Sequence, residues 1–258
     1  MRYFLRLAYN GTPFHGWQIQ PNAISVQEVL NKALSLILRT ELSVMGAGRT
    51  DTGVHAKEMF AHFDWDSDLD CIDLTYKLNR LLDENIVIYS IFKVDKEDDH
   101  TRFTAVSRTY EYVISTFKNP FLSDGGYLFQ RKLDVHAMNA AAEVLLGKKD
   151  FSCFSKSNTQ TKTNICNLTF AKWEERNGLL IFTITADRFL RNMVRAVTGT
   201  LLKVGIGEWS IFDVERIRES KERSEAGESV PAKGLYLVEV KYPEHIENKF
   251  ERKTPVIG

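Results

Sequence analysis

The sequence predicts an α+β fold of two ferredoxin-like βαββαβ halves, with antiparallel sheets joined across a central cleft. Some segments alternate apolar and polar residues as half-buried strands do, and others repeat apolar residues at helical spacing. The order in which strands and helices follow each other occurs twice along the chain. We therefore predict two domains, residues 1–103 and 104–258.

The first half is predicted as strand, helix, two strands, helix and strand. Ser25 and Glu28 form a capping box at the start of the first helix, whose apolar residues share one face. The predicted strands of this half lie at residues 3–9, 42–47, 58–65 and 86–94, and its second helix lies at 73–82.

The second half repeats this order. Asn177-Gly178 is a strong signal for a tight hairpin turn between two strands. We expect strands at 107–116, 165–174, 179–186 and 235–242, and helices from Asp134 to Gly147, at 189–204 and at 211–220. Two further segments, 148–164 and 221–233, are predicted to be irregular, exposed loops.

The composition of the 258 residues is typical of a soluble globular protein, with 43% hydrophobic and 26% charged residues. No run of about 18 apolar residues predicts a membrane span. The N-terminus has charges within its apolar stretch, which favours a first strand over a signal peptide. Cys71, Cys153 and Cys166 are odd in number and widely spaced, which favours reduced thiols in the cytoplasm over disulfides or zinc.

The formal net charge is zero, so the total charge does not indicate a nucleic-acid partner. Phosphate binding needs a local basic surface rather than a basic total, however. The histidines show no metal-binding spacing, since His55 and His62 lack the His-Glu-x-x-His arrangement. We expect no metal ion.

The most informative segment is residues 46–56, Gly46-Ala47-Gly48-Arg49-Thr50-Asp51-Thr52-Gly53-Val54-His55-Ala56. Its glycines indicate a tight turn at which backbone approaches a ligand. An ordinary Asp-x-Gly turn with Arg49 paired to a neighbour is the competing interpretation. A phosphate loop fits worse, because Asp51 stands where Gly-x-Gly-x-x-Gly requires glycine and a carboxylate repels phosphate.

This segment resembles the signature of the tRNA pseudouridine synthase A family. The resemblance extends from about Tyr9 to Tyr242 in the order of the family's motifs. The other matching segments are Gly11-Thr12-x-Phe14-His15-Gly16-Trp17-Gln18-x-Gln20-Pro21, Arg102-Phe103-x-Ala105 with Arg108-x-Tyr110-x-Tyr112, Asp150-Phe151-x-x-Phe154, Phe189-Leu190-x-x-Met193-Val194-Arg195 with Gly199-x-Leu201 and Val204-Gly205-x-Gly207, and Ala232-x-Gly234-Leu235-x-Leu237.

The resemblance implies that Asp51 is a catalytic nucleophile acting on uridine in the anticodon arm of tRNA, at tRNA positions 38 to 40. It also implies a homodimer that needs no metal and no cofactor. The chemistry agrees, because moving the C1′ bond of uracil from N1 to C5 neither oxidises nor removes anything. A carboxylate can attack C1′ or steady an oxocarbenium-like ribose. Removal of a sugar proton by Asp51 remains an alternative.

Arg195 is the predicted holder of this carboxylate, because the family has an arginine there and a guanidinium can grip a carboxylate with two hydrogen bonds. On a helical wheel Arg188, Arg191 and Arg195 fall in one stripe, which is also typical of a plain solvated face. Tyr110 lies on an alternating strand, where a tyrosine is commonly core. The family places its active-site tyrosine there, which favours stacking on uracil.

Other residues in these motifs are predicted to contact RNA, with the target nucleotide flipped out of its stack. They are Trp17, Gln18, Arg49, His55, Arg102, Phe103, Arg108, Arg188 and Arg191, and Lys148, Lys149, Lys156 and Lys162 add basic surface. Core packing explains Trp17 equally well. Two other functions compete: a non-catalytic tRNA-binding protein, which gains little from Asp51, and a nucleosidase, which would release free uracil.

Overall fold

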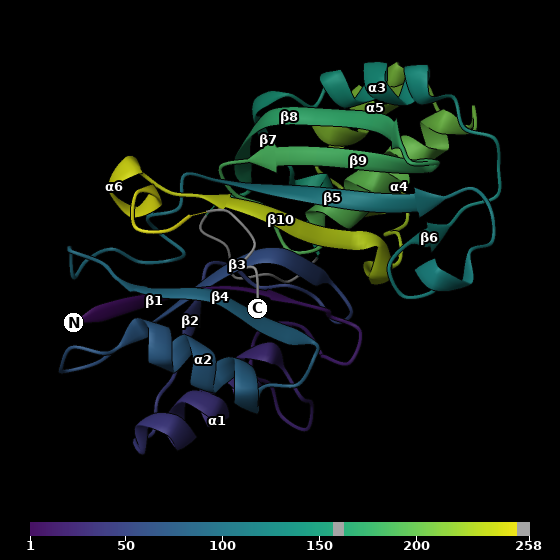
Figure 1. The fold of residues 1–258 in the computed structure, drawn as a ribbon. Helices are drawn as coiled ribbons and strands as arrows, with labels where there is room; N and C mark the ends of the chain where they lie inside the picture. The colour runs from purple at the N-terminus through teal and green to yellow at the C-terminus, as the bar shows by residue number, and fades with distance from the viewer. Residues whose placement is uncertain (157–162, 252–258) are drawn as a thin grey trace. The chain divides into compact units, whose positions relative to one another are not determined.

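The computed structural model describes residues 1–156 and 163–251, which form two compact units (Figure 1). Unit 1 contains Met1–Val106 and the residues from Leu237 onward, and unit 2 contains Ser107–Tyr236. Six α-helices and mostly antiparallel strands make up the described residues, as the α+β prediction requires. The division into domains at residues 103 and 104 stays a prediction.

The centre of unit 1 is strand β1 (Arg2–Tyr9), which is buried along most of its length. It pairs antiparallel with β3 (His55–Asp64) on one side and with β4 (Ile86–Lys93) on the other. The short strand β2 (Met45–Gly46) pairs antiparallel with β3. Strand β10 (Leu235–Lys241), most of which belongs to unit 1, also neighbours β3. The signature segment, residues 46–56, therefore runs from β2 to the start of β3.

Two helices lie together on one face of this sheet (Figure 1). Helix α1 (Val26–Leu38) begins where predicted, with the Ser25 hydroxyl accepting from the backbone N–H of Glu28 at 3.3 Å. Helix α2 (Cys71–Leu81) begins at the cap Asp70, whose carboxylate accepts two backbone N–H groups. Both helices turn leucines into the core, and on α1 these belong to the apolar face that the sequence showed.

The predicted strand at 42–47 is wrong for most of its length, since only Met45 and Gly46 are strand. The backbone before them is used by side chains of α1 instead. Asn31 accepts the N–H of Val44 at 2.9 Å, and the Gln27 amide donates to the Val44 carbonyl at 2.7 Å. These tertiary hydrogen bonds replace a strand ladder, and local sequence does not reveal them.

Strand β3 is buried on both faces rather than alternating. The C-terminal segment supplies the second cover, because Phe60 contacts the rings of Tyr242 and Phe250 at centroid distances of 5.0 and 5.1 Å. Beside them Arg6 and Glu58 form a buried ion pair at 2.8 Å. These contacts explain why the last residues belong to unit 1 although they follow unit 2 in sequence.

Unit 2 contains the strand order β5-β9-β8-β7. Strand β5 (Ser107–Ser115) pairs antiparallel with β9 (Leu179–Ala186), and β9 pairs with β8 (Ile165–Arg176). The β8–β9 connection is the predicted tight hairpin, since Asn177 and Gly178 have φ of +54° and +75°. Strand β6 (Tyr127–Leu128) pairs parallel with β5, and strand β7 (Gly147–Asp150) pairs antiparallel with β8.

The described residues of unit 2 also form three α-helices, and α4 (Met193–Gly205) is the most buried of them. Helices α3 (Val135–Glu143) and α5 (Ile211–Ser220) pack against α4. The predicted end of α3 at Gly147 is wrong, because that glycine has φ of +94° and begins β7. The short helix α6 (Glu244–Glu247) follows β10 in unit 1.

The predicted start of α4 at residue 189 is also wrong. Asn192 stands before the helix in the left-handed region, with φ of +67°, and the chain turns there. Arg188 and Arg191 therefore lie outside α4, and the predicted stripe shared with Arg195 does not exist. An αL residue interrupts the right-handed helical path, so residues on its two sides do not share one helical wheel.

The described parts of the two predicted exposed loops contain 3₁₀ turns and buried residues. In the first, β7 is followed by a 3₁₀ turn, Ser152–Phe154, beside which Phe151 is fully buried. In the second, the turns Arg223–Glu225 and Ala232–Gly234 flank the buried residues Ala226 and Val230. Lys162 and its neighbours in 157–162 lie outside the described residues.

No helix in residues 1–156 and 163–251 combines the length and the apolar character that crossing a bilayer requires. All three cysteines are free thiols. Burial raises the pKa of Cys153 and of Cys166 to about 12, so both remain protonated at neutral pH.

His62 provides a test of the core of unit 1. Burial lowers its pKa to about 4, helped by the nearby His100 and Arg2. Unfolded histidine has a pKa of about 6.5, so between pH 7 and 4 the unfolded chain binds a proton that the folded protein refuses. We expect the free energy of unfolding to fall on acidification through this window, and His62→Gln to remove about 2 kcal/mol of that fall.

The measurement is urea unfolding at a series of pH values, with the exposed His136→Gln as matched control. The control should keep the wild-type pH dependence. An unchanged pH dependence in His62→Gln would contradict the assignment of this loss of stability to the buried His62.

Candidate active site

Asp51 begins the tight turn that leads from β2 into β3. The backbone N–H of Val54 donates to the Asp51 carbonyl at 3.1 Å, and Gly53 has φ of +76° at the third position of this turn. Asp51 itself is half-buried. The turn therefore carries the Asp51 side chain on a backbone with little freedom.

A second loop braces this turn. The N–H of Trp17 donates to the Thr50 carbonyl and the N–H of Gly53 donates to the Phe14 carbonyl, both at 3.3 Å. The hydroxyls of Thr50 and Tyr9 lie 2.9 Å apart and share a hydrogen bond. Residues 11–18 and residues 50–54 thus hold each other in place through their main chains.

Gly16 allows this close approach. Its φ is +83°, and a side chain at this position would collide with the carbonyl of Thr50. Gly46 leaves room for another neighbour, since a Cβ there would overlap the ring of Trp17. Gly16 and Gly46 therefore serve packing between the two matched segments, which the spacing within either segment did not reveal.

Trp17 and His55 are inside unit 1, with exposed fractions of 2% and 5%. The Trp17 ring packs beside Tyr9 at a centroid distance of 6.1 Å, which favours the core role that the sequence left open. His55 accepts the N–H of Gly11 on Nδ1 at 3.1 Å. The Trp17 ring lies against Gly46 and His55 binds Gly11, whereas Gln18 and Arg49 are exposed.

Arg102 and Phe103 protrude from another turn of unit 1. Phe103 is 76% exposed, with the His100 ring 4.5 Å from its own and the Arg102 guanidinium 5.6 Å from its centroid. The base of this turn is fixed by Thr101, whose hydroxyl donates to the Met45 carbonyl at 2.9 Å. An exposed aromatic ring beside a cation is a suitable platform for a nucleobase.

Tyr110 and Arg108 lie on β5 in unit 2. Tyr110 is half-buried opposite Ile184 of β9, and Phe189 meets its ring edge-on at 5.1 Å. Arg108 donates to the Asp187 carbonyl at 2.9 Å. Tyr110 is thus a supported aromatic ring that remains partly accessible.

Arg195 stands in the first turn of α4 and is half-buried. Its Nε donates to the Val230 carbonyl at 2.7 Å, and the Val230 N–H donates back to the Arg195 carbonyl at 3.3 Å. Close by, the Tyr112 hydroxyl donates to the Pro231 carbonyl at 2.7 Å. Burial raises the pKa of Tyr112, so this phenol stays neutral. Sequence reasoning missed Val230, because a carbonyl acceptor leaves no signal in residue type.

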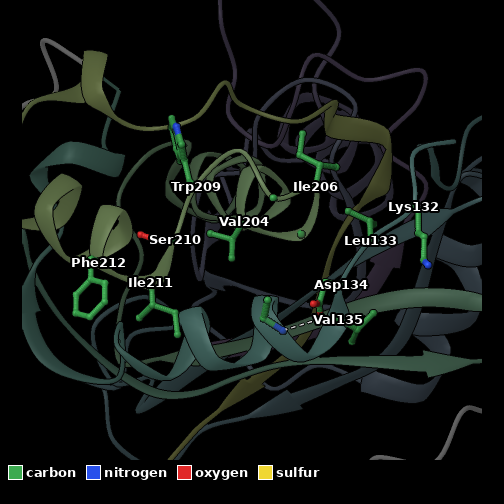
Figure 2. A pocket seen from close by; sticks show the side chains of 13 residues that line it. Lys132, Leu133, Asp134, Val135, Val204, Ile206, Trp209, Ser210, Ile211 and Phe212 are labelled. Atoms are coloured by element: carbon green, nitrogen blue, oxygen red, sulfur yellow. Dashed lines mark hydrogen bonds between the residues drawn. The ribbon is translucent and has the colours of Figure 1, made fainter.

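A groove in unit 2 lies elsewhere, between the start of α3, the end of α4 and the start of α5 (Figure 2). It is mostly apolar, and Figure 2 shows Val204, Ile206 and Trp209 among its lining. None of the predicted site residues lines it. Within residues 1–156 and 163–251, no three His, Cys, Asp or Glu side chains gather as a metal site would need.

The comparisons with known proteins identify the family. Residues 141–243 match the model of the tRNA pseudouridine synthases. A protein of Bacteroides fragilis named tRNA pseudouridine synthase A is 51% identical over 247 residues, covering 95% of this chain and 98% of the relative. The chain belongs to the tRNA pseudouridine synthase family. It is therefore an isomerase that acts on uridine in tRNA.

Other relatives extend the match. Proteins of the same name from Porphyromonas gingivalis and Acetivibrio thermocellus are 51% and 40% identical, over 94% and 92% of this chain and 97% and 98% of their own lengths. The family resemblance stated from the motifs is thus confirmed over nearly the whole enzyme. The aligned lengths include the signature turn of unit 1, which the family model's span of 141–243 does not reach.

The two glycines near Asp51 give a matched pair for testing the brace. Gly16→Ala should lower the free energy of unfolding by about 2 kcal/mol, because alanine would carry strain at positive φ and collide with Thr50. Gly48→Ala, in the segment that carries Asp51, should change it by no more than about 0.5 kcal/mol, because a Cβ there meets no atom within 4 Å.

Urea unfolding of both variants measures the difference. Equal stability of the two would show that the contact between Gly16 and Thr50 does not hold the turn.

Proposed function

We propose that this enzyme converts uridine to pseudouridine in the anticodon stem-loop of tRNA, at tRNA positions 38 to 40, with Asp51 as nucleophile. The observation that carries this proposal is the half-buried Asp51 on a turn braced by backbone hydrogen bonds. A protein that only bound RNA would gain nothing from an anion held so firmly beside phosphates.

In the proposed reaction, a carboxylate oxygen of Asp51 attacks C1′ of the ribose while the C1′–N1 bond breaks. The electron pair of that bond leaves with the uracil ring, which stays in the site and rotates. C5 then attacks C1′, the bond between Asp51 and C1′ breaks, and the proton on C5 is lost while N1 regains one. Atoms and charge balance without a cofactor, and none is proposed.

Arg195 is proposed to orient this carboxylate. A guanidinium carries five N–H donors in one plane, so the bond from Nε to Val230 fixes the direction of the whole fork. A fork of fixed direction can hold a carboxylate by two hydrogen bonds and keep it ionised. This role requires that Asp51 of unit 1 and Arg195 of unit 2 face a common cleft, and we propose the two ferredoxin-like halves joined in that way.

Tyr110 is proposed to stack on the uracil ring as it turns. The edge-on contact with Phe189 holds the phenol ring without covering it fully. A stacked base keeps its contact while it rotates in its own plane, which hydrogen bonds would not permit. The uridine reaches this ring only when it is flipped out of the anticodon arm.

Several exposed or half-buried residues are proposed to hold the RNA backbone and flanking bases. They are Gln18, Arg49, Arg102, Phe103, Arg108, Arg188 and Arg191. Trp17 and His55 are proposed to act through the loop that they support. We further propose that the enzyme works in the cytoplasm as a homodimer.

The central test substitutes Asp51. Asp51→Ala should release no tritium from the uracil C5 position of labelled tRNA and form no pseudouridine, because the attack on C1′ lacks its nucleophile. The neighbouring exposed Thr52→Ala should keep wild-type turnover. Filter binding should show both variants retaining tRNA.

The same assay separates the competing functions. A nucleosidase would release free uracil and lower the mass of the RNA, and a mere binding protein would release no tritium even as wild type. Turnover by Asp51→Ala would overturn the proposed role of Asp51.

Arg195→Ala should lower the single-turnover rate by about 100-fold or more, because the carboxylate loses the group that orients it. Binding of tRNA should weaken by a much smaller factor. Arg195→Lys should recover little of the rate, since an ammonium group is no planar fork. A rate within about twofold of wild type in Arg195→Ala would contradict the orienting role.

A further inference from the structure

The segment that carries the Val230 carbonyl wraps closely over helix α4. We call residues 223–231 the strap. The strap and α4 meet through their main chains, because a Cβ at Gly199 would collide with the Glu228 carbonyl. The N–H of Gly227 donates to the Thr200 hydroxyl at 2.9 Å in a buried position. The strap is therefore a packed part of unit 2 rather than the exposed loop that the sequence predicted.

Arg223 holds the strap in its bent shape. One Nη of its guanidinium donates to the carbonyls of Ala226 and Gly227 at 3.3 and 3.1 Å. The other donates to the Ser229 hydroxyl at 2.9 Å. A single planar group thus spans most of the segment between its own position and Val230, and fixes the course of the chain there.

Asn192 joins the same network from the start of α4. It is the residue before the helix, yet its side chain makes no capping hydrogen bond. Its amide donates instead to the Ser229 hydroxyl at 2.5 Å. The first turn of α4 carries Arg195, and the strap carries Val230. The hydrogen bond between Asn192 and Ser229 therefore joins these two segments close to the hydrogen bond between Arg195 and Val230.

From this network we propose that Arg223 is a positioning residue for catalysis: by clasping the strap, it holds the Val230 carbonyl where it orients the Arg195 guanidinium. The inference rests on the proposed role of Arg195 and adds what sets the direction of its fork. Arg223 does not touch the substrate in this proposal. Its effect passes through Val230 to the side chain that holds the nucleophile.

A direct experiment follows hydrogen exchange at the Arg195 Nε–H by ¹⁵N-detected NMR, assigned through its loss in Arg195→Ala. Arg223→Ala should speed this exchange at least about tenfold, because the carbonyl acceptor is no longer held in place. The matched control is Arg216→Ala, which removes a 2.9 Å ion pair to Glu225 at the start of the strap and leaves the hydrogen bonds of Arg223 in place. The control should exchange as the wild type does.

Turnover supplies the functional arm. With saturating tritiated tRNA, Arg223→Ala should lower the single-turnover rate about tenfold or more, while tRNA affinity changes less than about threefold. In an Arg195→Ala background the same substitution should have no further effect on the rate, because the residue through which it acts is gone. Its effect on thermal unfolding should persist in that background, which separates positioning from stability.

Ser229→Ala removes a single oxygen from the network and serves if Arg223→Ala does not fold. It should raise the exchange rate and lower turnover in the same direction. Unchanged exchange in the clasp variants, or an equal loss of rate with and without Arg195, overturns the positioning role. A wild-type protein that releases no tritium would instead count against the proposed function. The exchange experiment would still test whether Arg223 holds the Val230 carbonyl in place.

Discussion

The contact on which the candidate site depends is a backbone-to-backbone one, between the loop of residues 11–18 and the turn of residues 50–54. Its hydrogen bonds join Trp17 to Thr50 and Gly53 to Phe14, on either side of Asp51. Main-chain contact at this distance requires residues without side chains, which explains Gly16. For the nucleophile proposed at Asp51, a backbone braced in this way limits the freedom that is lost on reaction, and pre-organisation of this kind is one way in which enzymes reduce the entropic barrier.

The same principle recurs in unit 2 with different parts. Arg195 is long and flexible, so a backbone brace alone could not direct its terminal group. Here the strap crosses α4 at Gly199 and offers the Val230 carbonyl to the side-chain Nε. Arginine suits this arrangement because one hydrogen bond fixes a rigid plane that carries further donors. In both units a glycine lets two segments distant in sequence meet at main-chain distance, Gly16 in unit 1 and Gly199 in unit 2.

The sequence predicted elements well where their signals are local. The caps at Ser25 and Asp134, the hairpin at Asn177-Gly178 and the buried stripes of the helices all depend on neighbours in sequence. Predictions failed where distant residues intervened. The backbone at Val44 is taken by side chains of α1, the Asn192 amide bonds Ser229 instead of capping α4, and the C-terminal Phe250 covers β3. No window of local sequence contains those partners, so periodicity alone could not find them.

By itself the sequence determined the chemistry: which side chains stand in the signature segments, that a carboxylate is among them, and which family they belong to. Residue type fixes charge, donors and acceptors, and these are legible without coordinates. Only the tertiary structure decided which motif residues support and which are presented to solvent, since burial is a property of the whole chain. It placed Trp17 and His55 inside, left Phe103 exposed, and gave Arg195 a main-chain acceptor that no residue letter records.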